Sequence, residues 1–287
     1  MKIVLSFLIV WIASVISLPA QVPAEVGGVS CEIVIAQDEY IPGEEVKVGV
    51  RIVNRSGETL FLGKDNKWLT FSVESNEKRF VREKAVPPVA GAFSVPPSKM
   101  GTKIIPLTPY FDISQLGRYT VSATLQIPSW SEPVKARAKT FDVVGGTPVR
   151  SVQFGIPNLS GRTNAEPDTR RYVLQKLERL GRVKLYFTLT DASGARIDEA
   201  FPLCEMPSAS LPEIQLDQHN NAHILVQTGV KTAIYYEINF VGVVVGRQTY
   251  QHAAALPHLG MDKNGNIIVM GGQRLLASTD LPPPELP

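Results

Sequence analysis

Residues 111–123 read Phe-Asp-Ile-Ser-Gln-Leu-Gly-Arg-Tyr-Thr-Val-Ser-Ala and contain the sharpest local pattern in the chain. After Gly117, the residues Tyr119, Val121 and Ala123 alternate with smaller polar residues. A period of two is typical of a strand that buries one face. The stretch therefore predicts a turn that leads into a half-buried β-strand.

The residues before this strand have the same periodicity. Segment 46–53 alternates between apolar and mostly polar residues and lies between two turn signals, and segment 69–74 alternates in the same way. Lys103–Leu107 is predicted to be a short strand. Four prolines between positions 87 and 97 exclude a central strand there, because proline has no N–H to donate. We therefore predict that residues 30–144 form an antiparallel β-sandwich.

The order of Gly117, Tyr119, Val121 and Ala123 resembles the tyrosine corner of immunoglobulin-like (Ig-like) sandwiches. In that family, a Tyr near the start of the penultimate strand hydrogen-bonds back to the preceding corner. The resemblance implies structural roles for Tyr119 and Gly117. It is to bacterial Ig-like domains, because Val121 replaces the disulfide Cys of antibody domains and Trp68 is only a loose match to their core Trp. Residues 117–125 also resemble small bacterial proteinase-inhibitor sandwiches.

A composition change marks a boundary in the middle of the chain. Residues 145–148 read Gly-Gly-Thr-Pro and are predicted to be a linker to a second unit, residues 149–278. Residues 184–190 and 195–201 are predicted to form a hairpin. Segment 168–181 fits either an amphipathic helix or a strand paired with 184–190, and its all-β surroundings favour the strand. Val241–Val245 is predicted to be a buried strand.

An internal repeat is the most informative feature of the second unit. Residues 212–225 and 257–270 are related by an offset of 45, and each copy reads as strand, tight turn, strand. The turns contain Asp217 with Asn221 and Asp262 with Asn266. An Asp side chain can accept hydrogen bonds from backbone N–H groups two residues later, so these four residues are predicted to be structural. Two more strand patterns lie between the copies.

Four strands in a 45-residue period resemble the blades of secreted bacterial β-propellers. The resemblance implies a C-terminal antiparallel β-meander with two blade-like repeats. A closed propeller needs at least four blades, so this chain cannot close one alone. Three alternatives remain open: a meander that packs on the first unit, an open sheet that oligomerises, or chance similarity of hairpins. We favour the first.

The ends of the chain suggest an exported protein. Met1–Ala20 combines Lys2, an apolar run and a small residue before a cleavage point, which indicates a signal peptide cut after Ala20, with Ala24 as second choice. The alternative is a membrane anchor, but the apolar run is short for a span. No later segment is long and apolar enough to cross a bilayer. Residues 279–287 form a proline-rich tail.

Several chemistries lack a recognisable signature. The 29 basic and 27 acidic residues give a net charge of +2, which offers no electrostatic case for nucleic acid. His219 and His223 are too far apart along a strand to share one metal ion, and His252 and His258 have no nearby ligand in sequence. We therefore predict no catalytic residues, metal site or cofactor. Whether Cys31 and Cys204 pair stays open.

Taken together, these patterns predict an all-β, non-catalytic protein of the periplasm, cell envelope or extracellular space. Its function would be structural or recognition, with a protein or an envelope glycan as partner. An envelope-associated hydrolase is the first alternative; its site would be assembled from distant residues such as His223 or His252 with an acid. A proteinase inhibitor is the second alternative, and it depends on residues 117–125 alone.

Overall fold

The computed structural model of the chain describes residues 25–76, 80–128, 130–156, 168–252 and 255–281. The predicted signal peptide with Ala20 and most of the proline-rich tail lie outside these residues. Strands β1 to β22 make up the regular structure, and the predicted all-β class is confirmed. The described residues contain no helix that could span a membrane.

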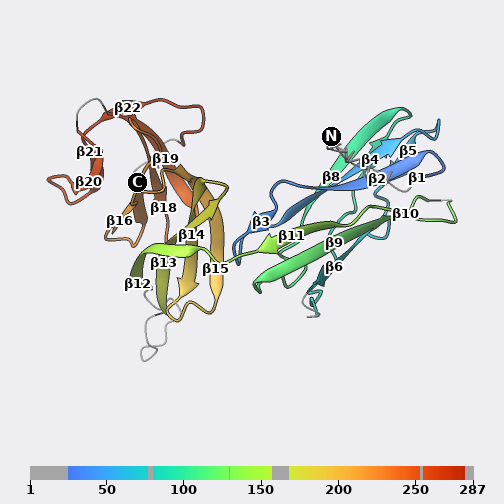
Figure 1. Ribbon diagram of the computed structural model, residues 1–287, viewed down its shortest axis with the longest axis horizontal. Coiled ribbons are helices and arrows are strands. Elements are labelled where there is room, and N and C mark those ends of the chain that lie inside the picture. Colours follow the sequence, from blue (N-terminus) through green and yellow to red (C-terminus); the bar gives the residue numbers. More distant parts are fainter. Residues whose placement is uncertain (1–24, 77–79, 129, 157–167, 253–254, 282–287) are drawn as a thin grey trace, which may run out of the picture.

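Two sheets form the N-terminal unit (Figure 1). The first has the order β1-β2-β4-β8, and its strands are Glu25–Val26, Val29–Ile35, Lys47–Asn54 and Lys99–Pro106. The second places β9 (Gly117–Leu125) between β6 (Leu69–Ser75) on one side and β10 (Val134–Lys135) and β11 (Lys139–Val143) on the other, with β3 (Glu39–Tyr40) beyond β11. A separate two-stranded antiparallel sheet pairs β5 (Leu60–Leu62) with β7 (Phe93–Val95).

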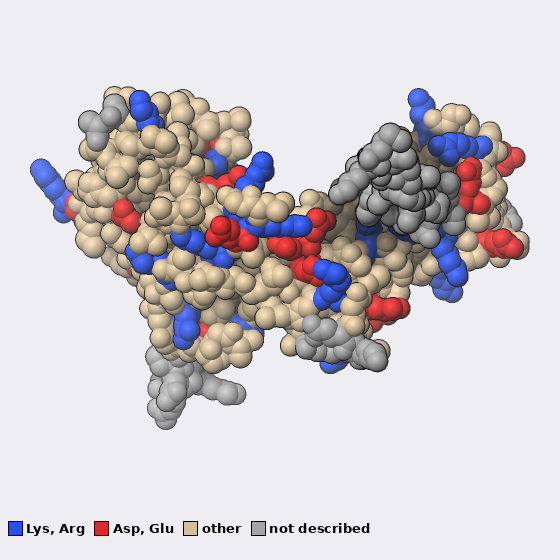
Figure 2. Space-filling view, in the orientation of Figure 1, with Lys and Arg blue, Asp and Glu red and all other residues tan. Residues whose placement is uncertain are grey.

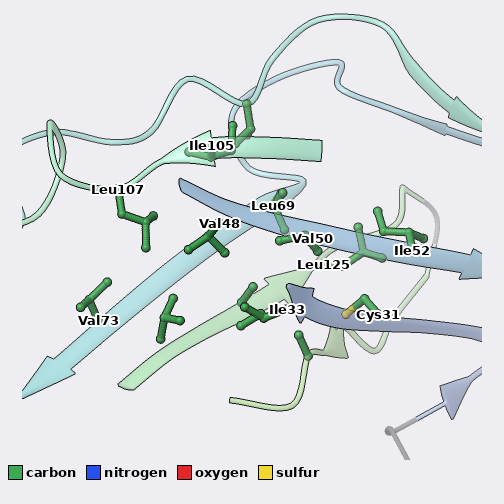
Figure 3. Packing of buried hydrophobic residues seen from close by; sticks show 14 of the residues in the cluster. Cys31, Ile33, Val48, Val50, Ile52, Leu69, Val73, Ile105, Leu107 and Leu125 are labelled. Atoms are coloured by element: carbon green, nitrogen blue, oxygen red, sulfur yellow. The ribbon is translucent and has the colours of Figure 1, made fainter. Parts of the chain in front are cut away.

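The inward residues of both sheets form one core, which Figure 3 shows. Val48, Val50 and Ile52 of β4 are fully buried, and Leu125 of β9 meets them from the opposite sheet. Each buried aliphatic side chain removed from water contributes roughly 1.5–3 kcal/mol. The apolar side chains at alternate positions of these strands therefore hold the two sheets together.

The second unit begins with a four-stranded antiparallel meander. Its strands, in spatial and chain order, are β12 (Thr147–Ile156), β13 (Asp168–Arg179), β14 (Arg182–Asp191) and β15 (Ile197–Met206). Segment 168–181 is thus mostly strand, as its surroundings favoured, and Arg179 pairs with Arg182 across the turn. Leu180 and Gly181 make that turn with positive φ angles of 49° and 76°.

A second meander follows and resembles a propeller blade in its strand order. It runs through β16 (Glu213–Leu216), β17 (Ala222–Gln227), β18 (Thr232–Ile238) and β19 (Val244–Gln251), with β22 (Gln273–Leu275) added to β19. The hairpin of β20 (His258–Met261) and β21 (Ile267–Met270) is a separate two-stranded sheet.

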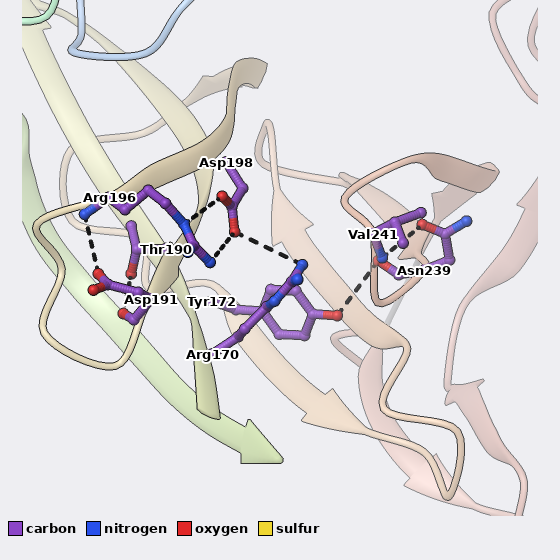
Figure 4. A network of polar contacts seen from close by, with 8 residues as sticks. All are labelled: Arg170, Tyr172, Thr190, Asp191, Arg196, Asp198, Asn239 and Val241. Atoms are coloured by element: carbon purple, nitrogen blue, oxygen red, sulfur yellow. Dashed lines mark hydrogen bonds and ion pairs between the residues drawn. The ribbon is translucent and has the colours of Figure 1, made fainter. Parts of the chain in front are cut away.

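The sheets of the second unit lie one against the next. Leu174 and Leu185 of the first meander share a core with Ile224 of the second. Tyr172 spans this core, and its hydroxyl donates to the Asn220 carbonyl at 2.8 Å and lies 3.4 Å from that of Asn239. Figure 4 shows this reach, with Arg170 and Arg196 gathered around Asp198 on the same sheet.

The hairpin of β20 and β21 covers the other face of the second meander. Leu259 and Ile267 pack there on Leu225, Ala233 and Tyr235. The second unit is therefore a stack of three layers, in which the middle sheet is buried on both faces.

The two units meet at a small apolar contact ringed by charge. Ile41 packs on Tyr186 and Ala200. Around them, Arg179 lies 3.4 Å from Asp38 and 3.6 Å from Glu39. Figure 2 shows that the molecule narrows at this junction and has both basic and acidic side chains on its surface there. Tyr186 and Ala200 belong to β14 and β15, so it is the first meander of the second unit that contacts the first unit. We favoured a blade-like repeat packed on the first unit, but β17 and β18 of the repeat pack on the first meander instead.

A buried carboxyl group supports the junction. Burial raises the pKa of Glu44, although its carboxylate accepts hydrogen bonds from the Ile41 N–H at 3.0 Å and from Gln37 at 2.6 Å. Gln37 in turn accepts a hydrogen bond from Lys184 of the second unit at 3.1 Å. This polar chain fixes the loop that carries Ile41.

The structure corrects the prediction for Val241–Val245 and shows the state of the two cysteines. Val241–Val245 is not a buried strand: Val241 and Val243 are exposed, and both donate N–H groups to the Asn239 side chain. Asn239 thus makes a turn out of an apolar run. Cys31 and Cys204 are both free thiols, and burial raises the pKa of each to about 11.

Residues 279–281, which we expected to belong to the tail, lie against β19. The Asp280 carboxylate accepts a hydrogen bond from the Thr249 hydroxyl at 2.8 Å and lies 3.3 Å from Arg247 and 3.1 Å from Arg274. Burial alone would raise the pKa of Asp280, but these hydrogen bonds and charges outweigh it and lower the pKa. The last described residues are therefore anchored.

Candidate binding groove beside strand β6

The residues predicted to shape the first unit lie next to one of its sheet edges. The Tyr119 hydroxyl donates to the Gln115 carbonyl at 2.8 Å, four residues upstream, and Gly117 has a positive φ of 142°. Tyr119 also stacks on Phe141 in the core. These contacts fix the turn between Phe111 and the start of β9, and β9 in turn carries β6 as its neighbour.

The two copies of the repeat form the same turn. In each, the aspartate carboxylate accepts N–H groups from the residues two and four positions later, at 2.8 and 2.9 Å from Asp217 and at 2.8 Å in both cases from Asp262. The amides of Asn221 and Asn266 return to the same carboxylates at 2.9 and 3.0 Å.

The four histidines are dispersed. His223 is buried between Tyr235, whose hydroxyl lies 2.6 Å from Nδ1, and Asp217, whose carboxylate lies 3.4 Å from Nε2. His219 and His258 are exposed, and His252 is half-buried. The acid that His223 meets therefore comes from its own hairpin. Within the described ranges, no three His, Cys, Asp or Glu residues are grouped closely enough to hold a metal ion.

Strand β6 forms an open edge of its sheet, at the lower rim of the N-terminal unit in Figure 1. The Gln126 N–H donates to the Trp68 carbonyl, and the Asn76 N–H donates to that of Arg118. Hydrogen-bonded pairs recur at every second residue of an antiparallel ladder. The even-numbered residues therefore bond to β9, and the N–H and C=O groups of Phe71 and Val73 point away from it. No described strand pairs with β6 on that side.

A groove of about 550 Å³ runs beside this edge. Residues of β6, the segment around Phe80 and Val81, and Phe111 from the corner stretch line it. Phe80 is 90% exposed, which is unusual for a large aromatic residue. Phe111, in contrast, is buried and belongs to the core. The groove thus has one aromatic side chain fixed in the core, Phe111, and one exposed to solvent, Phe80.

Two carboxylates flank the apolar surface. Glu74 of β6 and Glu83 opposite it line the groove, and both are exposed. Neither forms an ion pair with another described residue. The groove therefore offers aromatic side chains and two negative charges next to the outward backbone groups of β6.

Comparison with known proteins gives little further information about this site. No family model and no curated protein matches the chain. Among solved structures, Spo0M, a sporulation control protein from Bacillus subtilis, is similar over 64% of this chain and 92% of its own, with 11% sequence identity and a TM-score of 0.28. A similarity at this level supports no inference about fold or function.

Proposed function

We propose that this protein is an exported, non-catalytic recognition protein that binds an extended segment of a partner protein along β6. The observation that carries the proposal is the open edge of β6 beside an aromatic groove. An added strand would pair with the outward backbone groups of Phe71 and Val73, which gives affinity, while its alternate side chains enter the groove, which gives specificity.

The groove chemistry defines the segment it would take. Phe71, Phe80 and Phe111 favour aromatic or branched apolar side chains. Glu74 and Glu83 favour a Lys or Arg near them. The expected ligand is therefore an extended protein segment with apolar residues at alternate positions and at least one basic residue. The alternation matters because successive side chains of a strand point to opposite faces.

We also propose that the N-terminal sandwich is Ig-like and that the chain is exported. The hydrogen bond from Tyr119 to the corner carbonyl supports the first proposal. The apolar run before Ala20 supports the second. N-terminal sequencing of the protein purified from its own cells tests export: a chain that begins at Gln21 supports it, and a chain that retains Met1–Ala20 contradicts it.

A peptide library displayed on phage tests the proposed binding. The library is panned on the chain from Gln21, and peptides that also bind a Phe80→Asp variant are removed. We expect enriched sequences to alternate apolar residues and to contain Lys or Arg. Phe61→Asp is the matched control, because Phe61 is also highly exposed but lies outside the groove. The proposal would be contradicted if no peptide remained after this subtraction, or if the remaining peptides failed to bind Phe61→Asp as well.

A further inference from the structure

The second copy of the repeat stops halfway through a blade. In the first copy, the chain continues from β17 into β18 and β19, which makes four strands. In the second copy, Gly271 and Gly272 follow β21 with φ angles of 74° and 77°, and β22 returns to β19. A residue with a Cβ is strained at such angles, so these glycines allow the reversal. The second copy therefore contributes only the two strands of the hairpin at the far end of the unit in Figure 1.

The two edges of this hairpin differ. The Asp262 N–H donates to the Asn266 carbonyl at 2.9 Å, so even-numbered residues bond within the hairpin and odd-numbered ones point outward. On β20, the outward N–H of Leu259 donates to the Glu213 carboxylate at 2.8 Å. On β21, no described residue forms a comparable bond with Ile267 or Val269. Among the described residues, the β20 edge is therefore hydrogen-bonded to the second meander, whereas the β21 edge is open.

The outer face of the hairpin exposes two apolar side chains of β21. Ile268 and Met270 are 40% and 43% exposed. Their equivalents 45 residues earlier are His223 and Leu225, which are 6% and 4% exposed. A terminal repeat normally presents a polar outer face. Nor does β21 contain the charge or proline that commonly protects a strand edge from pairing.

We propose that β21 pairs antiparallel with β21 of a second copy of this chain, so that two hairpins complete one four-stranded blade. Two-fold symmetry makes a contact of this kind close on itself. A two-fold axis through Ile268 would let every outward backbone group of β21 form a hydrogen bond. Ile267 would then pair with Val269 of the partner subunit, and Val269 would pair with Ile267 of the partner subunit. Strand β21 has no charged side chain that would oppose self-association. The contact is small, so we expect a weak dimer.

Sedimentation velocity on the chain from Gln21 tests the proposal over about 1 to 500 µM, the range suited to a weak contact. We expect a concentration-dependent monomer–dimer equilibrium. Ile268→Lys places two like charges opposite each other at the axis and should weaken the dimer at least tenfold, as should Ile268→Glu. An equimolar mixture of the two variants should dimerise again. Met100→Lys, at an exposed apolar residue of β8, is the control and should change nothing.

Three outcomes would overturn the proposal. The wild-type chain could stay monomeric throughout the range, or its dimer could tolerate Ile268→Lys. The third uses a milder change, Ile268→Cys, because residues directly opposite in a non-hydrogen-bonded pair lie about 4.5 Å apart and suit a disulfide. Under oxidation we expect a covalent dimer that reductant reverses. A folded Ile268→Cys chain that does not cross-link would exclude this register.

Discussion

Strands β6 and β21 both present an open edge, but they differ in what surrounds it. The β6 edge borders an aromatic groove, and Glu74 and Glu83 set its charge. The β21 edge carries no charged side chain, and it has apolar residues on its outer face. An edge with a shaped and charged border discriminates among partners, whereas a bare apolar edge suits a copy of itself. The difference therefore separates recognition from assembly.

The two edges also differ in how firmly they are held. The inner residues of β6, Leu69 and Val73, belong to the large core of the sandwich. The inner residues of β21, Ile267 and Val269, pack on a small cluster under the hairpin. A rigid edge can bind a flexible ligand without itself paying an ordering cost. We expect the hairpin, by contrast, to gain stability from its partner.

Replacing the inner valine of each strand with aspartate should give the largest effect. Val73→Asp buries an unpaired charge in the main core, so we expect a loss of about 4 kcal/mol or more in the free energy of unfolding. Val269→Asp should cost only about 1–2 kcal/mol, because Val269 is half-buried. Urea unfolding measures both. Equal losses would show that the two strands are held alike.

Reversing the charges of the groove should give the next largest effect. Glu74→Lys and Glu83→Lys should each weaken a peptide selected on the wild-type chain about tenfold, which corresponds to about 1.4 kcal/mol. Fluorescence anisotropy with the labelled peptide measures this. Glu132→Lys, at an exposed residue outside the groove, makes the same change in net charge and serves as the control. If it has the same effect, the groove carboxylates are not specific.

Acid should weaken the two repeat turns unequally. Burial alone would raise the pKa of Asp217, but hydrogen bonds from Asn221 and His219 outweigh it and lower the pKa. Hydrogen bonds from Asn266 lower the pKa of Asp262. A lowered pKa contributes stability above the ordinary value of 3.8 that is lost as the pH falls through the folded value.

We therefore expect the second unit to lose stability as the pH falls below about 4. Asp217→Asn should cost about 1–2 kcal/mol at pH 7, since its carboxylate is largely buried and satisfies several donors. Asp262→Asn should cost less, because the hydrogen bonds that the Asp262 carboxylate accepts are exposed to solvent. Thermal unfolding at pH 7 and pH 3 measures both. A larger effect at Asp262 would mean that the second turn stabilises the stack more than the first.

Salt should have the smallest effect and should differ between the two edges. Peptide binding at β6 should weaken modestly between low and high salt, because exposed charges are screened over a Debye length of about 10 Å at 0.1 M. Dimerisation through β21 should change less than about twofold, since its contact is apolar. Repeating both titrations at two salt concentrations measures this. A strongly salt-dependent dimer would point to a charged interface instead.

Much of the architecture could be predicted from the sequence because it follows from local rules. Alternation located β4, β6 and β9, and the 45-residue offset located two turns that match bond for bond. The apolar run Val241–Val245 misled because a single side chain, Asn239, turned it. Local composition does not reveal such a turn when the surrounding residues favour a strand.

The groove and the open edges could not be predicted in the same way. They depend on which strands lie beside one another, and Phe80 and Phe111 are 31 residues apart in the chain. Only Phe111 lay in a stretch that the sequence singled out. The repeat was visible, but that its second copy stops after two strands depends on where β22 pairs. Sheet order is a long-range property that periodicity does not encode.

Residue-resolved amide hydrogen exchange of the chain, with and without a selected peptide, tests the central claim most directly. If a peptide adds to β6, the outward amides of Phe71 and Val73 should exchange at least tenfold more slowly when it is bound, while those of Ile267 and Val269 stay unchanged at constant protein concentration. Protection that appears at Ile267 and Val269 instead, or no protection at Phe71 and Val73 under saturating peptide, would contradict the account.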